Sequence, residues 1–128
     1  MPYFYKLEGK VAIPVSWESE YIEWLLGDPD HGRRVVASDK FEYKGGVVHV
    51  STVFILGINH ALGNGDPLLF ETMIFDGPMD GYQVRYSTWE QAEFGHKKAL
   101  EELFQQVPEL TPPREEYATR FERILKED

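Results

Sequence analysis

One stretch, residues 47–87, constrains the fold of this chain more than any other. It reads VVHVSTVFILGINHALGNGDPLLFETMIFDGPMDGYQVRYS. Residues that favour strands, the β-branched and aromatic types, gather in three parts of it. Glycine, proline and aspartate separate the second part from the third, as in a turn. We therefore predict three antiparallel strands at Val47–Leu56, Leu68–Phe75 and Tyr82–Ser87.

The register of the first two strands follows from their apolar residues, because side chains alternate between the faces of a strand. If Leu56 lies opposite Leu68, residues of the same type also lie opposite each other further along the two strands. Apolar side chains then occur on both faces, whereas a sheet with one wet face alternates more cleanly. We therefore expect a helix on one face and a second helix or another subunit on the other. The predicted cross-strand pairs are Phe54 with Phe70 and Thr52 with Thr72.

The loop between these strands, Gly57–Pro67, is longer than the hairpin connections of ~2–5 residues that are usual. Its glycines permit close backbone approach, and its short polar side chains can bind a ligand or metal, or close local turns. The second interpretation is an ordered loop whose polar groups satisfy its own backbone, and turn-rich loops commonly have this composition. The spacing fits neither a phosphate-binding nor a calcium-binding pattern. The candidate ligand residues are Asn59, His60, Asn64 and Asp66.

The N-terminal third predicts short elements separated by turn residues. Ser16 precedes a run with helical spacing of aromatic residues and is a suitable N-cap. Gly27 ends that run, and Asp28-Pro29-Asp30-His31-Gly32 has turn composition. The expected elements are strands Tyr3–Leu7 and Lys10–Val15, a helix Trp17–Leu26, a strand Arg33–Ala37 and a connection over 38–46.

A long helix is predicted from about residue 88 to Gln106. Ser87 with Glu90 fits a capping box, and Thr88 with Gln91 is the alternative. One apolar stripe includes His96, which places this histidine on the inward face, where a hydrogen-bonded core role is commoner than catalysis. The stripe consists of Trp89, Ala92, His96, Ala99, Leu100, Leu103 and Phe104.

These elements predict an α+β fold over residues 1–107. An antiparallel sheet of about five or six strands packs against the long helix, with a shorter N-terminal helix beside it. Residues 108–128 are expected to form a linker and an amphipathic helix that packs on this domain or on a neighbouring subunit. Its apolar residues recur at helical spacing: Tyr117, Phe121, Ile124 and Leu125.

The composition excludes several classes of protein. The chain has 128 residues, no cysteine and a formal net charge of −9. Disulfide and thiolate chemistry are therefore excluded, and an acidic chain lacks the basic surface that grips nucleic acid. No stretch is apolar enough for a membrane span, and MPYFYKLEGK does not read as a signal peptide. We therefore expect a cytoplasmic protein that binds neither nucleic acid nor membrane.

Two charged residues on neighbouring predicted strands, Glu71 and Arg85, allow two interpretations. Arg85 lies diagonally across from Glu71 in the expected sheet. The pair is then either a cross-strand ion pair of modest value or an arginine that binds an anion and is oriented by the carboxylate. The residues do not separate these alternatives.

Three segments carry a resemblance to a known group of proteins. VSTVFILGINH, PLLFETMIF and YQVRYSTWEQAEFGH resemble segments like STVFLGIDH, PLLFETM and RYATWEEAEAGH. Those segments occur in a family of small uncharacterised bacteriophage and prophage proteins. The resemblance covers about Tyr3 to Leu103 and is most specific from Gly45 to His96. Asn59 stands where the family has Asp, which weakens a role for this position as a metal ligand or acid.

The resemblance implies a phage or prophage origin and therefore a host cell. We expect a small binding protein that sequesters a host signalling nucleotide, or another small anionic molecule, or that blocks a host defence protein. It is expected to use no cofactor or metal and to form a homo-oligomer. The expected ligand-binding residues are Asn59, His60, Asn64, Asp66, Glu71, Arg85 and His96.

Two alternatives belong to other classes. A small hydrolase would use His60 or His96 with Asp66 or Glu71, because general acid–base catalysis needs such pairs within hydrogen-bond reach. Metal-dependent hydrolysis is weakly supported, because no HxH, HxxxH or HExxH spacing occurs. A virion or assembly component is the other alternative, and apolar residues on both sheet faces are its one indication.

Overall fold

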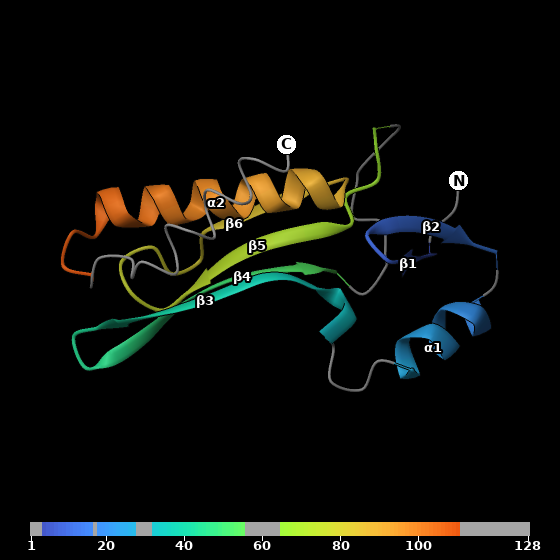
Figure 1. Ribbon diagram of the computed structural model, residues 1–128, viewed down its shortest axis with the longest axis horizontal. Helices are drawn as coiled ribbons and strands as arrows, with labels where there is room; N and C mark the ends of the chain where they lie inside the picture. Colours follow the sequence, from blue (N-terminus) through green and yellow to red (C-terminus); the bar gives the residue numbers. More distant parts are fainter. Residues whose placement is uncertain (1–3, 17, 28–31, 56–64, 111–128) are drawn as a thin grey trace.

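The computed structural model describes residues 4–16, 18–27, 32–55 and 65–110 (Figure 1). The fold is α+β, and the described residues form antiparallel strands and two α-helices. The elements are β1 (Phe4–Glu8), β2 (Val11–Val15), α1 (Glu18–Leu26), the 3₁₀ turn η1 (Gly32–Arg34), β3 (Val35–Tyr43), β4 (Gly46–Phe54), β5 (Phe70–Phe75), β6 (Gln83–Tyr86) and α2 (Trp89–Gln106).

The strands form two sheets, which corrects the expected single sheet of five or six. β1 and β2 pair only with each other, and the larger sheet has the order β3-β4-β5-β6. The N-terminal hairpin meets the larger sheet through side chains instead of backbone pairing. Tyr5 and Leu7 of β1 pack with Phe54, Phe70 and other buried residues at one end of that sheet. Figure 1 shows the hairpin beside this end.

The third strand is longer than predicted and begins later. Arg33 and Arg34 belong to η1, and the strand covers Val35–Tyr43, including most of the expected 38–46 connection. Lys44 and Gly45 have φ values of 46° and 81°, as a two-residue hairpin turn of type I′ requires. The expectation was wrong because β3 is an edge strand, so its solvent-facing polar residues resemble a loop.

The predicted register of the two central strands is confirmed. Phe54 pairs with Phe70, and Thr52 pairs with Thr72. On the next strand Arg85 lies directly opposite Glu71, and not diagonally from it. β5 begins at Phe70 instead of Leu68.

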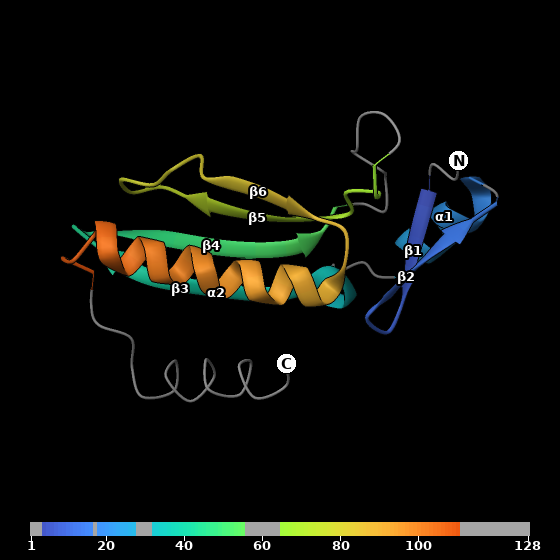
Figure 2. The same ribbon diagram turned by 90° about the horizontal axis from the view of Figure 1, so that it is seen from above.

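The main core lies between α2 and one face of the larger sheet. Figure 2 shows α2 lying along one face of this sheet, with β6 at the outer edge, and the helix packs against all four strands. Val107 and Leu110 extend the core beyond the end of the helix. The expected C-terminal helix falls on residues 111–128, which lie outside the described part. The buried residues of this core are Phe41, Val48, Val50, Ile74, Met79, Ala99, Leu100, Leu103, Val107 and Leu110.

Helix α2 begins with a capping box centred on Thr88. The Thr88 hydroxyl accepts from the Gln91 backbone N–H at 3.1 Å, and the Gln91 side chain accepts from the Thr88 N–H. We predict that Thr88→Ala lowers the free energy of unfolding by about 1 kcal/mol, because the Gln91 N–H loses its acceptor. Ser87→Ala is the control, since Ser87 contributes only its backbone N–H to the Gln91 side chain. Urea denaturation of both variants checks this, and equal losses would contradict it.

Candidate functional site

The structure separates the residues that the sequence analysis grouped into one ligand site. Glu71 and Arg85 project from the sheet face turned away from α2, whereas His96 lies on α2 and is 1% exposed. The sheet therefore stands between them. Asp66 is exposed. The other three candidates, Asn59, His60 and Asn64, lie outside the described residues.

Glu71 and Arg85 form a cross-strand ion pair. Arg85 Nε lies 2.9 Å from Glu71 Oε2, and Gln83 Nε2 donates to the same oxygen. The Glu71 side chain is 12% exposed, and that of Arg85 is 38% exposed. The carboxylate thus has two donors on its own sheet, which matches the structural interpretation of this pair.

His96 belongs to a buried polar chain that takes one residue from each of the four strands. His96 Nε2 lies 2.7 Å from Asp39 Oδ2 of β3, and Nδ1 lies 2.7 Å from Thr52 Oγ1 of β4. Thr52 Oγ1 lies 2.5 Å from Thr72 Oγ1 of β5. Tyr86 of β6 donates its hydroxyl to Thr72 Oγ1 at 3.1 Å. Side chains far apart in sequence therefore meet beneath α2.

One set of hydrogen-bond directions gives each of these donors an acceptor. Tyr86 donates to Thr72, so the Thr72 proton is free for Thr52, and the Thr52 proton for His96 Nδ1. Nε2 is then the protonated ring nitrogen and donates to Asp39. This order uses each proton once and leaves none of these buried hydroxyl and ring N–H donors without an acceptor, which is the condition for a stabilising buried network.

The buried hydrogen-bond chain contains a carboxylate, a histidine and a hydroxyl group, as a catalytic triad does, but a substrate cannot reach these groups. Asp39, Thr52, Thr72 and His96 are 0–3% exposed. No substrate can reach Thr52 or His96 in this arrangement, since a general base must approach the proton that it removes. Among the five residues, Tyr86 alone is only partly buried. The buried hydrogen-bond chain therefore holds the Tyr86 side chain in place.

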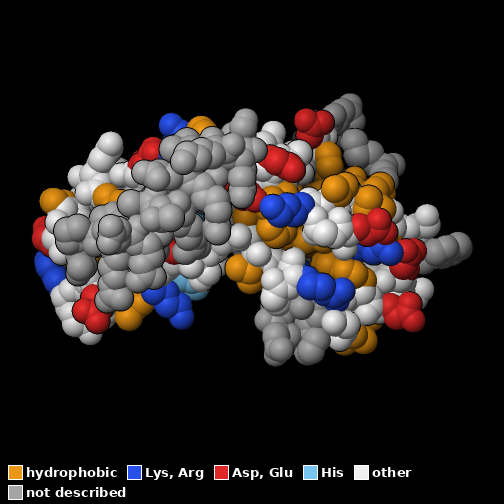
Figure 3. Space-filling view, in the orientation of Figure 1, with side chains coloured by type: hydrophobic (Ala, Val, Ile, Leu, Met, Phe, Trp, Pro, Cys, Tyr) orange, Lys and Arg blue, Asp and Glu red, His pale blue; other side chains and the backbone are white. Residues whose placement is uncertain are grey.

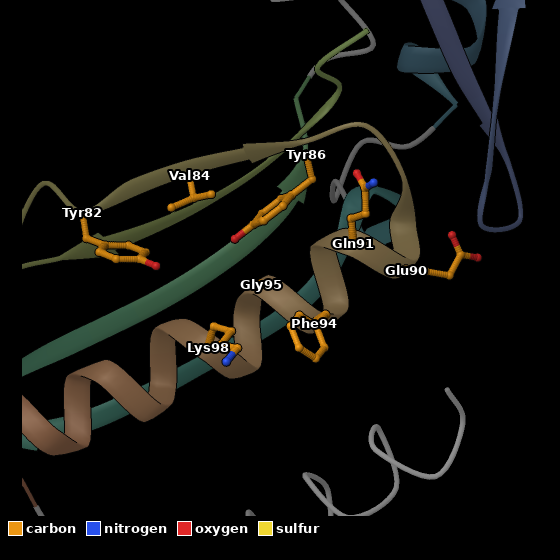
Figure 4. Close-up of a pocket in the computed structure, with 8 residues that line it drawn as sticks. All are labelled: Tyr82, Val84, Tyr86, Glu90, Gln91, Phe94, Gly95 and Lys98. Atoms are coloured by element: carbon orange, nitrogen blue, oxygen red, sulfur yellow. The ribbon is translucent and has the colours of Figure 1, made fainter. Parts of the chain in front are cut away.

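Tyr86 lines a groove of about 570 Å³ between β6 and α2. Figure 4 shows Tyr82, Val84 and Tyr86 reaching from β6 toward the helix, where Phe94, Gly95 and Lys98 lie opposite. Val84 and Phe94 are 37% and 44% exposed, so apolar surface faces the solvent here. Glu90 and Gln91 complete the lining at the start of α2.

Gly95 allows Tyr86 to lie against the helix. A Cβ atom at position 95 would lie 2.0 Å from the Tyr86 hydroxyl oxygen and 2.1 Å from its Cζ. A side chain at this position would therefore push Tyr86 away from Thr72 and into the groove. A glycine in a helix interior lowers helix stability by up to ~1 kcal/mol relative to alanine. At position 95 the close packing of Tyr86 explains why glycine is present despite this cost.

The groove is lined by two phenol groups, one carboxylate and one ammonium group. Burial raises the pKa of Tyr82 to about 12, and the Glu102 carboxylate, which accepts its hydroxyl hydrogen, adds to this effect. Burial also raises the pKa of Tyr86. Both phenols are therefore protonated at neutral pH. Among the described lining residues Lys98 is the one cation, and its ammonium lies 5.4 Å from the Phe94 ring centroid.

In residues 4–16, 18–27, 32–55 and 65–110, no group of three or more His, Cys, Asp or Glu side chains is arranged to hold a metal ion. No helix in these segments has the length and apolar character needed to cross a membrane.

Neither the groove nor the partner of His96 is predicted from the sequence. Asp39 falls in the expected 38–46 connection and lies 57 positions from His96. Two signals for the groove are nevertheless present in the sequence. Tyr82, Val84 and Tyr86 share one face of their strand, and Phe94 is an aromatic residue off the buried stripe of α2.

No protein-family model, curated protein or solved structure matches this chain. The geometry and chemistry of its own residues therefore carry the functional argument.

His96 gives a test of the buried chain. We predict that His96→Ala lowers the free energy of unfolding by about 3 kcal/mol or more, because the buried Asp39 carboxylate loses the imidazole and a cavity remains. His49→Ala is the matched control, since His49 lies on the opposite sheet face and bonds the exposed Ser38 hydroxyl. Its loss should be about 1 kcal/mol or less. If His96→Ala and His49→Ala lower the free energy of unfolding equally in urea denaturation, the buried hydrogen-bond chain contributes no more stability than an exposed hydrogen bond.

Tyr82 gives a test at alkaline pH. Its pKa is about 12 in the folded chain and 10 ordinarily, so the unfolded chain releases this proton first. The contribution of Tyr82 is therefore complete below pH 10 and is lost as the pH rises toward 12. We predict that Tyr82→Phe has a smaller decline in stability across this window than the parent chain. Urea denaturation at stepped pH measures the difference, and parallel declines would refute it.

Proposed function

We propose that this chain is a small phage- or prophage-type binding protein that blocks a host protein by capturing one of its extended, basic and apolar segments. The site is the groove between β6 and α2. One observation carries the proposal: the groove lies along a strand at the edge of the sheet. Such an arrangement supplies both backbone hydrogen bonds and side-chain pockets to an added strand.

The edge of β6 has backbone groups directed away from the sheet. The carbonyl oxygens of Tyr82 and Tyr86 accept hydrogen bonds from Ile74 and Leu69, on the β5 side. Backbone groups alternate in direction along an antiparallel strand, so those of Gln83 and Arg85 point outward. No described strand pairs with this side of β6. An extended peptide can therefore pair with Gln83 and Arg85.

The groove supports recognition of apolar side chains. Alternate residues of an added strand project to the same side as Val84 and Tyr86, and so enter the groove. Phe94 and Tyr82 supply aromatic walls there, and such residues commonly dominate binding energy. The buried chain and Gly95 hold Tyr86 in one position, which lowers the ordering cost of binding.

The charge supports a basic partner. Along the exposed and half-exposed positions of α2, Glu90, Glu93, Glu101 and Glu102 outnumber Lys97 and Lys98. The whole chain has a formal net charge of −9, so long-range attraction also favours a cationic partner. A nucleotide or another small anion fits less well, because Lys98 is accompanied by Glu90 in the described lining.

The hydrolase alternative has less support in the described residues. His96 is 1% exposed and already engaged on both ring nitrogens. Of the other candidates, Glu71 lies on the opposite sheet face, Asp66 is exposed, and His60 lies outside the described residues. Binding at the groove, in contrast, needs only residues that already line an open surface.

Amide hydrogen exchange tests the proposal directly. The probe is a peptide of alternating valine and lysine, with alternating valine and glutamate as the control. We predict that the valine–lysine peptide slows exchange at the Gln83 and Arg85 amides, which point outward, and leaves that of Val84 unchanged. Unchanged exchange at Gln83 and Arg85 with bound peptide would overturn strand addition, and preference for the glutamate peptide would overturn the charge argument.

A pair of variants locates the site. Phe94→Glu places a charge in the groove, so peptide affinity should fall by roughly ten-fold or more. Phe75→Glu alters a similarly exposed aromatic residue, 41% against 44%, on the opposite sheet face and should leave affinity unchanged. Equal effects would exclude the groove.

A further inference from the structure

The sheet face turned away from α2, here called the open face, carries no described element. Figure 1 shows α2 on the other side of the sheet. Val47, Phe75 and Val35 of this face are 50%, 41% and 38% exposed. Register places Ser51 opposite Met73 near its centre. The open face consists of Val35, Ser38, Lys40, Glu42, Val47, His49, Ser51, Val53, Glu71, Met73, Phe75, Gln83 and Arg85.

We infer that the open face is the interface between two copies of this chain, which pack sheet against sheet. The charge of the face supports a second copy as the occupant. Lys40 and Arg85 balance Glu42 and Glu71, so the strand residues of the open face sum to zero charge. Two chains with a net charge of −9 repel each other, and a neutral face minimises that cost.

The polar groups at the centre of the face are already paired within one chain. Glu71 receives Arg85 and Gln83, and His49 Nε2 lies 2.8 Å from Ser38 Oγ. Burial and the nearby Lys40 lower the pKa of His49, so this imidazole is neutral at neutral pH. Association therefore leaves the Glu71 carboxylate and the His49 ring with partners from their own chain, which limits the desolvation penalty at the centre of the interface.

The described part of the chain ends at Leu110, which is 4% exposed and belongs to the core between α2 and the sheet, on the side opposite to the open face. A second copy can approach the open face directly from solvent. Sheets that pack face to face lie ~10 Å apart, which suits side chains of the size of Met73 and Phe75.

Sedimentation equilibrium of the full chain tests the interface. We predict a reversible dimer, with tighter association at higher salt because screening reduces the repulsion between acidic chains. Phe75→Glu should raise the dissociation constant by on the order of a hundred-fold, since two like charges then meet in the interface. Phe94→Glu, which alters the groove, should leave dimerisation unchanged.

Two outcomes of this experiment would contradict the inferred interface. A monomer at every concentration and salt overturns the inference, and so does a dimer that Phe75→Glu does not weaken. Circular dichroism verifies the fold of each variant. Val47→Glu, at the most exposed apolar position of the face, replaces Phe75→Glu if that variant lacks the native spectrum. The groove is tested by peptide binding and the open face by mass, so the two proposals fail independently.

Discussion

The buried hydrogen-bond chain from Asp39 through His96 to Tyr86 is the constraint on which the rest of the structure depends. Each strand of the larger sheet contributes one member, and α2 contributes the histidine. A one-residue slip of any strand would turn its member to the other face and leave a buried polar group unsatisfied. Apolar packing is non-directional and is compatible with several strand registers. The hydrogen bonds of the buried chain, in contrast, can all form in only one register. The same bonds hold Tyr86 at the groove.

The sequence predicts the parts of this fold that depend on local periodicity. The β-branched and aromatic residues identify β4 and β5, and matching Phe54 with Phe70 and Thr52 with Thr72 identifies their register. The 3.6-residue stripe places His96 inside. β3 is predicted only over its first residues, Val35–Ala37, because the rest of this edge strand has the composition of a loop. Asp39 is missed for a further reason: its partner lies on an element 57 positions away, and local patterns carry no information at that range.

The groove could not be predicted because it is a consequence of dimensions. An α-helix with its side chains is ~10–12 Å across, whereas neighbouring strands are ~4.8 Å apart. A single helix therefore covers about half the width of a four-stranded sheet. α2 lies nearest to the central strands β4 and β5, so apolar residues of the edge strand β6 are left beside the helix. The element count determines this surface, and Tyr82, Val84 and Tyr86 then set its chemistry.

The two proposed surfaces meet at Gln83 and Arg85, whose side chains lie on the open face and whose outward backbone groups form the β6 edge. This has a consequence for binding strength. Packing through the open face leaves both β6 edges and both grooves accessible, because the grooves lie on the α2 side. A dimer therefore presents two equivalent sites. A host protein that is itself oligomeric, or that repeats its extended segment, engages the second site at a high effective concentration. Weak capture by a single short groove then suffices for strong retention. Loss of dimerisation would weaken capture of such a partner without altering the affinity of one groove for one peptide.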